Sequence, residues 1–173
     1  MKKISWILLL SVFIGLIGYF TYAKTDILIK NVTYPASWEE NEAFATGDQE
    51  GIKTVKNEDG SITQSMNIFT WYIKKKEKEQ EILRTIDLII ESEEHPSIHN
   101  ISHNEELSNL FIMVDRSTYE ENALVDGFVP MLLGMHCAIY QLYNGATLDN
   151  YHVKVTVQDF DTKEIINEVL VPW

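Results

Sequence analysis

Cysteine is almost absent from this chain of 173 residues, which contains only Cys137. One thiol cannot form a disulfide within the chain, so small domains held together by disulfides are excluded and the fold must rest on its own core. The same scarcity excludes a lipoprotein, because lipid attachment after export needs a cysteine at the end of the leader. Cys137 itself lies in an apolar stretch, where we expect it to pack as a small hydrophobic side chain.

Basic residues are also scarce, with 14 lysines and arginines against 26 aspartates and glutamates. Three of the lysines precede residue 25 and no acid does, so residues 25–173 hold 11 basic and 26 acidic residues, a net charge of −15. A domain with this charge is repelled by nucleic acid and by anionic lipid headgroups, so from net charge we expect neither as a partner. A cationic partner, a divalent metal or a neutral peptide remains compatible with it.

Recognisable catalytic motifs are missing. The chain has neither a Gly-x-Ser-x-Gly nucleophile elbow nor a glycine-rich phosphate loop. His136 and Cys137 are adjacent, but neighbouring residues of a helix point about 100° apart and do not face each other. Paired acids such as Asp159 and Asp161 fit turn chemistry. We therefore expect a protein that is not an enzyme.

What the chain does contain is an apolar segment at residues 4–22, which has no charged side chain and follows Lys2 and Lys3. Its length is close to the ~20 residues that cross a bilayer as a helix. The positive-inside rule keeps the lysines in the cytoplasm and places the rest outside. We expect an uncleaved signal anchor at residues 1–24, spanning the membrane once through residues 4–22. An extracytoplasmic domain at residues 25–173 follows. The alternative is a secreted domain, released by cleavage near Ala23.

Periodicity predicts a single domain that combines helices and strands. Alternating or continuous apolar runs predict the strands, at residues 26–34, 52–55, 61–63, 98–102, 110–114, 151–157 and 164–171. The pair Asp59–Gly60 predicts a tight hairpin turn. A long amphipathic helix is predicted from about Met66 to Glu93, although residues 68–73 fit a buried strand equally well.

A second helical region is predicted before the last two strands. Capping-box spacing at Ser117–Glu120 predicts its start, and Pro130 divides it into two pieces. Five residues recur at helical spacing and predict the buried face: Phe128, Leu132, Met135, Ile139 and Leu142. The apolar stretch 123–143 is interpreted as a core helix and not as a second membrane span, because polar residues interrupt it. The predicted fold is α+β, with two main helices packed on one face of a mainly antiparallel sheet.

Three histidines, His95, His99 and His103, form the sharpest local cluster. Four-residue spacing would place them on one face of a helix, but in a strand the first and second lie about 13 Å apart. If a loop brings them together, neutral imidazoles would ligate zinc or another divalent metal. The alternative is an exposed polar loop between a helix and a strand.

Two further segments carry functional hypotheses. Residues 71–78 place aromatics beside lysines, which suits either a membrane surface or a helix start with solvated lysines. The acidic loop from Ala36 to Glu50 contains Trp38 and Phe44, which could line a pocket for a small ligand or peptide.

Three functions are therefore compatible with the sequence. The first is a membrane-tethered domain that binds a protein partner in the cell envelope, and the composition favours a Gram-positive bacterium. The second is a metal-binding protein or metal-dependent enzyme that uses the three histidines. The third is an envelope sensor that uses the loop at residues 36–50.

Overall fold

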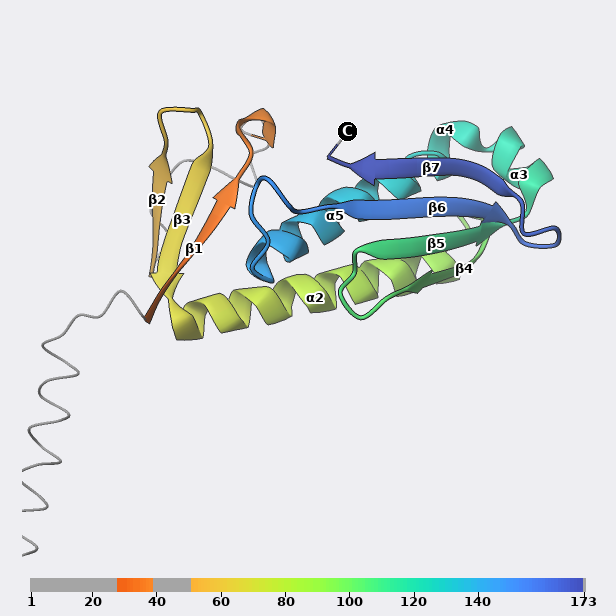
Figure 1. Cartoon of the computed structure of the whole chain (residues 1–173). Helices are drawn as coiled ribbons and strands as arrows, with labels where there is room; N and C mark the ends of the chain where they lie inside the picture. Colours follow the sequence, from red (N-terminus) through yellow and green to blue (C-terminus); the bar gives the residue numbers. More distant parts are fainter. Residues whose placement is uncertain (1–27, 39–50, 173) are drawn as a thin grey trace, which may run out of the picture.

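The computed structural model describes residues 28–38 and 51–172. The predicted α+β class with mainly antiparallel strands is confirmed, but the described strands form two sheets where the sequence predicted one. Figure 1 shows the smaller sheet at one end of an elongated molecule and the larger sheet at the other, with a long helix running between them. The predicted signal anchor at residues 1–24 lies outside the described residues.

The smaller sheet is built from the N-terminal strand and a hairpin. Its strands are β1 (Ile29–Tyr34), β2 (Ile52–Lys56) and β3 (Ile62–Asn67), in the order β1–β3–β2, all antiparallel. A short 3-10 turn, η2 (Ala36–Trp38), follows β1. Gly60 has a φ of 84°, which the hairpin turn between β2 and β3 needs and which side chains disfavour. The predicted hairpin is confirmed.

The larger sheet is mixed. Its strands are β4 (Ile98–His103), β5 (Asn109–Val114), β6 (Val153–Asp159) and β7 (Ile165–Val171), in that spatial order. The central pair, β5 and β6, is parallel and the outer pairs are antiparallel. A parallel pair needs a crossover connection, and the helices between residues 116 and 143 supply it.

Two helices cover one face of the larger sheet, α2 (Ile68–Glu91) and α5 (Val129–Tyr143). The short helices α3 (Arg116–Glu121) and α4 (Ala123–Asp126) lie at the end of the molecule far from the smaller sheet (Figure 1). Residues 68–73, which fit a strand equally well by pattern, are helical. The reason is the side chain of Asn67, which caps α2 by accepting hydrogen bonds from the N–H groups of Phe69 and Thr70.

The two ends of the fold are joined through a buried aromatic contact. The Tyr34 hydroxyl on β1 lies 3.0 Å from Gln64 Oε1 and 3.1 Å from the Tyr143 hydroxyl at the end of α5. Burial, and then the neighbouring Tyr143, raises the pKa of Tyr34 far above its ordinary value. Its proton is therefore retained for hydrogen bonding at any physiological pH.

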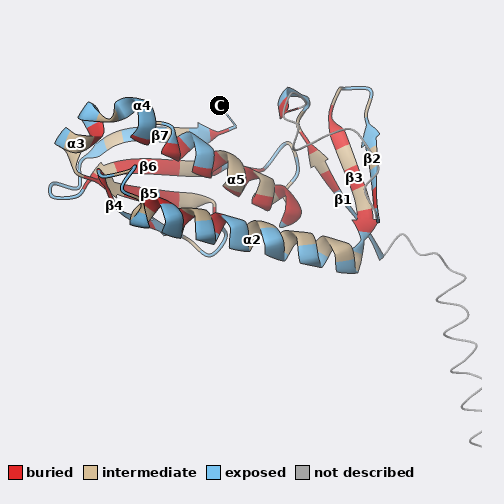
Figure 2. Ribbon diagram, turned by 180° about the vertical axis from the view of Figure 1, so that it is seen from behind, coloured by how far each residue is buried: buried red, intermediate tan, exposed pale blue. Residues whose placement is uncertain are grey.

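The predicted buried face of α5 is wrong in its first half. Phe128 and Leu132 are exposed, whereas Val129, Leu133 and Cys137 are buried. The reason is that α5 contacts the sheet and α2 at once, and this combination turns the helix away from the face that periodicity suggested. Figure 2 shows the resulting buried stripe of α5 against the sheet.

Cys137 is fully buried, as predicted from its apolar surroundings. Burial raises the pKa of its thiol to about 12, so the thiol stays protonated and unreactive. Among the described residues, 123–143 are long and apolar enough to cross a membrane. In this fold they form α4 and α5, and α5 packs against β6, β7 and α2.

The predicted capping box at Ser117–Glu120 is also wrong. The N-cap of α3 is Asp115, whose carboxylate accepts hydrogen bonds from the N–H group of Thr118 and the hydroxyl of Ser117. An aspartate two residues earlier, at the end of β5, offers the stronger acceptor and takes the capping position. These hydrogen bonds, led by those from Thr118, lower the pKa of Asp115 to about 2.

Replacing Asp115 by asparagine should therefore lower stability in a way that depends on pH. Asparagine keeps a capping oxygen but has no charge. Because the folded-state pKa is below the ordinary value of 3.8, the contribution of the charge is present above about pH 4 and is lost as the pH falls toward 2. Urea unfolding of both proteins from pH 7 to pH 2 should show a difference that shrinks with acid. A difference that stays constant would contradict the assignment.

Candidate functional site

The fold places the three predicted histidines in three different surroundings. His95 Nδ1 lies 2.8 Å from a carboxylate oxygen of Asp126, and the His99 ring lies 4.8 Å from the ring of Phe160, centre to centre. His103 Nδ1 lies 3.0 Å from its neighbour's carbonyl oxygen. Across residues 28–38 and 51–172, no group of three or more His, Cys, Asp or Glu side chains is placed to hold a metal ion. The metal site at these histidines stays a prediction and gains no support from this geometry.

A buried carboxylate, Asp126, is the feature that the sequence reasoning missed. It ends α4 and is fully buried. One of its oxygens contacts His95, and the other accepts a hydrogen bond from the hydroxyl of Ser97, which is itself fully buried. The sequence did contain a signal for this residue, since Asp126 is an acid inside an apolar stretch. A charged side chain in a core needs polar partners, so a search for such partners was warranted.

This group of three resembles a catalytic triad in composition but not in geometry. In a triad the serine donates to the histidine and the histidine to the acid, which makes the serine a nucleophile. Here Ser97 and His95 both contact Asp126, and the buried Ser97 hydroxyl is not open to a substrate. The arrangement ties the turn before β4 to α4. It stabilises the fold and does not activate a nucleophile.

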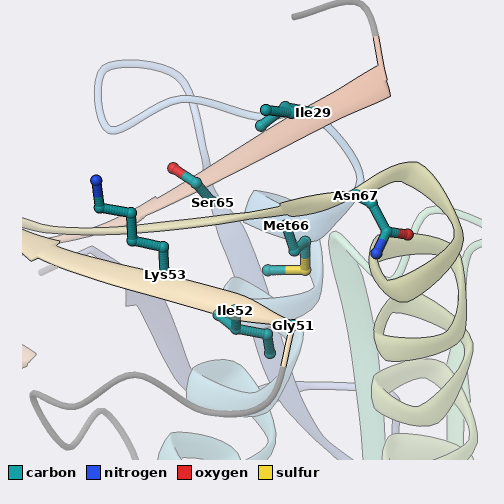
Figure 3. Close-up of a pocket in the computed structure, with 7 residues that line it drawn as sticks. All are labelled: Ile29, Gly51, Ile52, Lys53, Ser65, Met66 and Asn67. Carbon is teal, nitrogen blue, oxygen red and sulfur yellow. The ribbon is translucent and has the colours of Figure 1, made fainter. Parts of the chain in front are cut away.

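A hollow of about 530 Å³ opens at the end of the smaller sheet where the described chain begins. Its lining residues come from all three strands and the turns beside them: Ile29, Gly51, Ile52, Lys53, Ser65, Met66 and Asn67. Figure 3 shows Lys53 and Ser65 pointing to one side of the strands and Ile52 and Met66 to the other. The lining of the hollow therefore includes side chains from both faces of the smaller sheet.

The loop at residues 36–50 was predicted to line a pocket with Trp38 and Phe44. Of these two residues the structure describes only Trp38, and Trp38 does not line the hollow. Trp38 is buried and packs edge-to-face on Tyr151, with the ring centres 5.9 Å apart. Phe44 lies outside the described residues. A sensor pocket lined by Trp38 is therefore not supported, and a role for Phe44 stays a prediction.

Beside the hollow, the first turns of α2 expose large apolar side chains. The exposed fractions are 77% for Phe69, 57% for Tyr72 and 55% for Ile73. Leu28 and Ile29, the first described residues, are also exposed. We call these five residues the N-terminal corner.

Trp71 is the aromatic of this segment that turns inward. Its indole N–H donates to the carbonyl oxygen of Tyr143 at 3.0 Å. The Lys30 and Lys75 ammonium groups lie 5.3 Å and 5.7 Å from the centre of its ring, within cation–π distance. Trp71 thus fixes the start of α2 to the end of α5, which leaves its neighbours on the outer face.

A second exposed surface is the face of the larger sheet opposite α2 and α5, which no described helix covers (Figures 1 and 2). Strand register places Phe111, Lys154 and Leu170 on this face. Lys154 forms an ion pair with Glu168 at 2.5 Å, while Phe111 and Leu170 are exposed. We call this surface the open sheet face.

Comparison with known proteins found no match among protein-family models, curated proteins or solved structures.

Proposed function

We propose that the protein is a membrane-tethered extracytoplasmic domain that binds a protein partner in the envelope of a Gram-positive bacterium. The observation that carries the proposal is the open sheet face. A sheet with helices on one side and exposed Phe111 and Leu170 on the other offers apolar contact area around a central ion pair. Exposed apolar side chains gathered on one face mark candidate sites of protein–protein contact.

The tether is supported by the position of the described fold in the chain. Five residues, 23–27, separate the end of the apolar segment at residue 22 from Leu28, the first described residue. Five residues span at most about 18 Å when fully extended. If the segment is an uncleaved anchor, the domain is held close to the outer surface of the membrane.

Site-specific photo-crosslinking in intact cells tests the partner proposal. The full chain carries a photoreactive phenylalanine analogue at Phe111, at Leu170, or at Gln80 on the outer side of α2. We expect one recurrent protein adduct from the first two positions and none from Gln80. The Phe111→Ser and Leu170→Ser substitutions together should remove binding of the adduct protein to the full chain in detergent. Adducts at all three positions alike, or at none, would contradict the proposal.

Membrane extraction and protease accessibility test the proposed tether separately from the partner. The uncleaved protein should resist alkaline carbonate extraction of membranes, and protease added outside spheroplasts should digest the domain. A protein released to the medium with an N-terminus just after Ala23 would favour the secreted alternative.

A further inference from the structure

The N-terminal corner joins the point where the described chain begins to the start of α2. Strand register pairs Ile29 on β1 with Asn67 on β3. Asn67 is the N-cap of α2, and its side chain accepts from the N–H group of Phe69. Tyr72 and Ile73 follow three and four residues after Phe69, so the three side chains share one face of the helix. Exposed apolar side chains therefore lie directly beside the place where the chain enters the fold.

Charge in the described residues is distributed unevenly along the chain. Residues 28–38 and 51–78 contain seven lysines and three acids, whereas residues 79–172 contain four basic and seventeen acidic residues. Figure 1 shows that α2 runs from the N-terminal corner toward the end that holds α3 and α4. Within the described residues, the smaller sheet and the first turns of α2 therefore carry a net positive charge, and the remainder of the fold carries a net negative charge. Residues 39–50, which carry five acids, lie outside the described residues and are not part of this comparison.

The lysines near the corner are placed around its apolar side chains. Lys74 and Lys76 follow directly on α2, where each forms an i,i+3 ion pair, with Glu77 and Glu79. Lys53 points outward from β2 beside Ser65 (Figure 3). Exposed ion pairs of this kind are weak, so the lysines can exchange a glutamate for another anion.

We propose that the N-terminal corner binds the anionic lipid surface of the same membrane that residues 4–22 span. Large apolar and aromatic side chains flanked by lysines are the composition of interfacial membrane-binding helices. Tyrosine favours the headgroup level, and lysines are attracted to anionic lipid. The short connection to Leu28 keeps the corner within reach of the headgroups. This inference rests on the proposed tether and deepens it, because the contact fixes which way the domain points.

A second group of exposed apolar side chains lies at the opposite end of the molecule, and it differs from the corner in the charge around it. Leu124, Val125 and Phe128 are as exposed as the corner side chains, with Leu124 at 85%. Glu120 and Glu121 precede them in α3, within the part of the chain that holds seventeen acids. Anionic lipid would repel this end. The consequence of the contact is that this end and the open sheet face are carried away from the bilayer toward the cell wall.

The test uses the full chain in nanodiscs that contain phosphatidylcholine with 30% phosphatidylglycerol and a lipid with a nitroxide on its headgroup. A fluorophore is attached to a single new cysteine at Thr70, next to Phe69 of the corner, or at Ala123, in the exposed part of α4. The buried Cys137 does not compete for the label. We expect at least threefold stronger quenching at residue 70 than at residue 123.

Two matched variants identify the contact. The triple substitution Phe69→Ser, Tyr72→Ser and Ile73→Ser should reduce quenching at residue 70 to the level at residue 123. The control triple substitution Leu124→Ser, Val125→Ser and Phe128→Ser should leave it unchanged. All six side chains are exposed, so both variants should keep the far-ultraviolet circular dichroism of the parent. Pure phosphatidylcholine, or 0.5 M salt, should also reduce quenching at residue 70.

Equal quenching at residues 70 and 123 in discs that retain the chain would overturn the corner contact and leave the tether standing. Quenching that survives the corner substitutions would overturn it as well, since the named side chains would then not make the contact. A chain that does not stay with the discs would overturn both the tether and the contact.

Discussion

Replacing Leu133 by alanine is expected to lower the free energy of unfolding by about 3–5 kcal/mol, because the leucine lies in the core and the cavity left by a smaller side chain does not close. Leu133 has no exposed surface and sits on the inner face of α5. Urea unfolding of the full chain in detergent micelles, followed by circular dichroism, measures the change.

The neighbouring residue supplies the control. Leu132 is 44% exposed, so Leu132→Ala should cost less than about 1 kcal/mol. The periodicity of the sequence predicted Leu132 as a core residue, so this pair of variants also separates the observed orientation of α5 from the predicted one. A larger effect at Leu132 than at Leu133 would contradict the observed packing.

Replacing Asp126 by alanine is expected to cost about 2–4 kcal/mol. The substitution removes the acceptor of two side chains, His95 and Ser97, and leaves the buried Ser97 hydroxyl without a partner. Asp87 lies exposed on α2, so Asp87→Ala serves as the control and should change stability by less than about 0.5 kcal/mol. Equal effects of the two substitutions would show that Asp126 is solvated.

A double-mutant cycle tests the hydrogen bond between Ser97 and Asp126 directly. Ser97→Ala should be destabilising in the parent protein and nearly neutral when Asp126 is already alanine, because its partner is then absent. Additive effects would contradict a direct hydrogen bond. Ser97 is in the turn before β4 and Asp126 ends α4. The coupling free energy therefore measures how much this hydrogen bond contributes to holding α4 against the turn.

The functional proposals place different tasks at different parts of one domain. In these proposals the N-terminal corner would contact lipid, the open sheet face would contact a protein, and α2 runs from the corner along the larger sheet. An orientation fixed at the membrane would restrict the positions from which a partner can approach. Loss of the corner contact should therefore weaken partner binding in membranes while leaving it unchanged in detergent.

Several strands and turns could be predicted from the sequence because the residues that determine them are neighbours in the chain. In residues 151–157 every second residue is apolar, and Val153, Val155 and Val157 are indeed buried in β6. The hairpin at Gly60 depends on a positive φ that glycine supplies. The start of α2 was ambiguous, because an apolar run fits both a strand and a helix, and the decision came from one hydrogen-bonded cap, Asn67.

Other features depended on segments distant in sequence. Asp126 interrupts an apolar stretch, but its partners His95 and Ser97 are about thirty residues away and could not be paired from pattern. The division of the strands into two sheets depends on the pairing of β1 with β3 and of β5 with β6, across separations that periodicity does not encode. Sequence likewise placed Ser117 at a cap that Asp115 occupies.

By itself, the sequence determined the uncharged apolar segment at residues 4–22, the acidic net charge, the scarcity of thiols and the positions of most strands. These are properties of neighbouring residues, so they are visible without a fold. Tertiary structure alone decided which face of α5 is buried, that the three histidines have different partners, and that Phe69, Tyr72 and Ile73 are exposed at the start of α2. Burial and surface charge depend on what packs against each element, and that is set by contacts between distant parts of the chain.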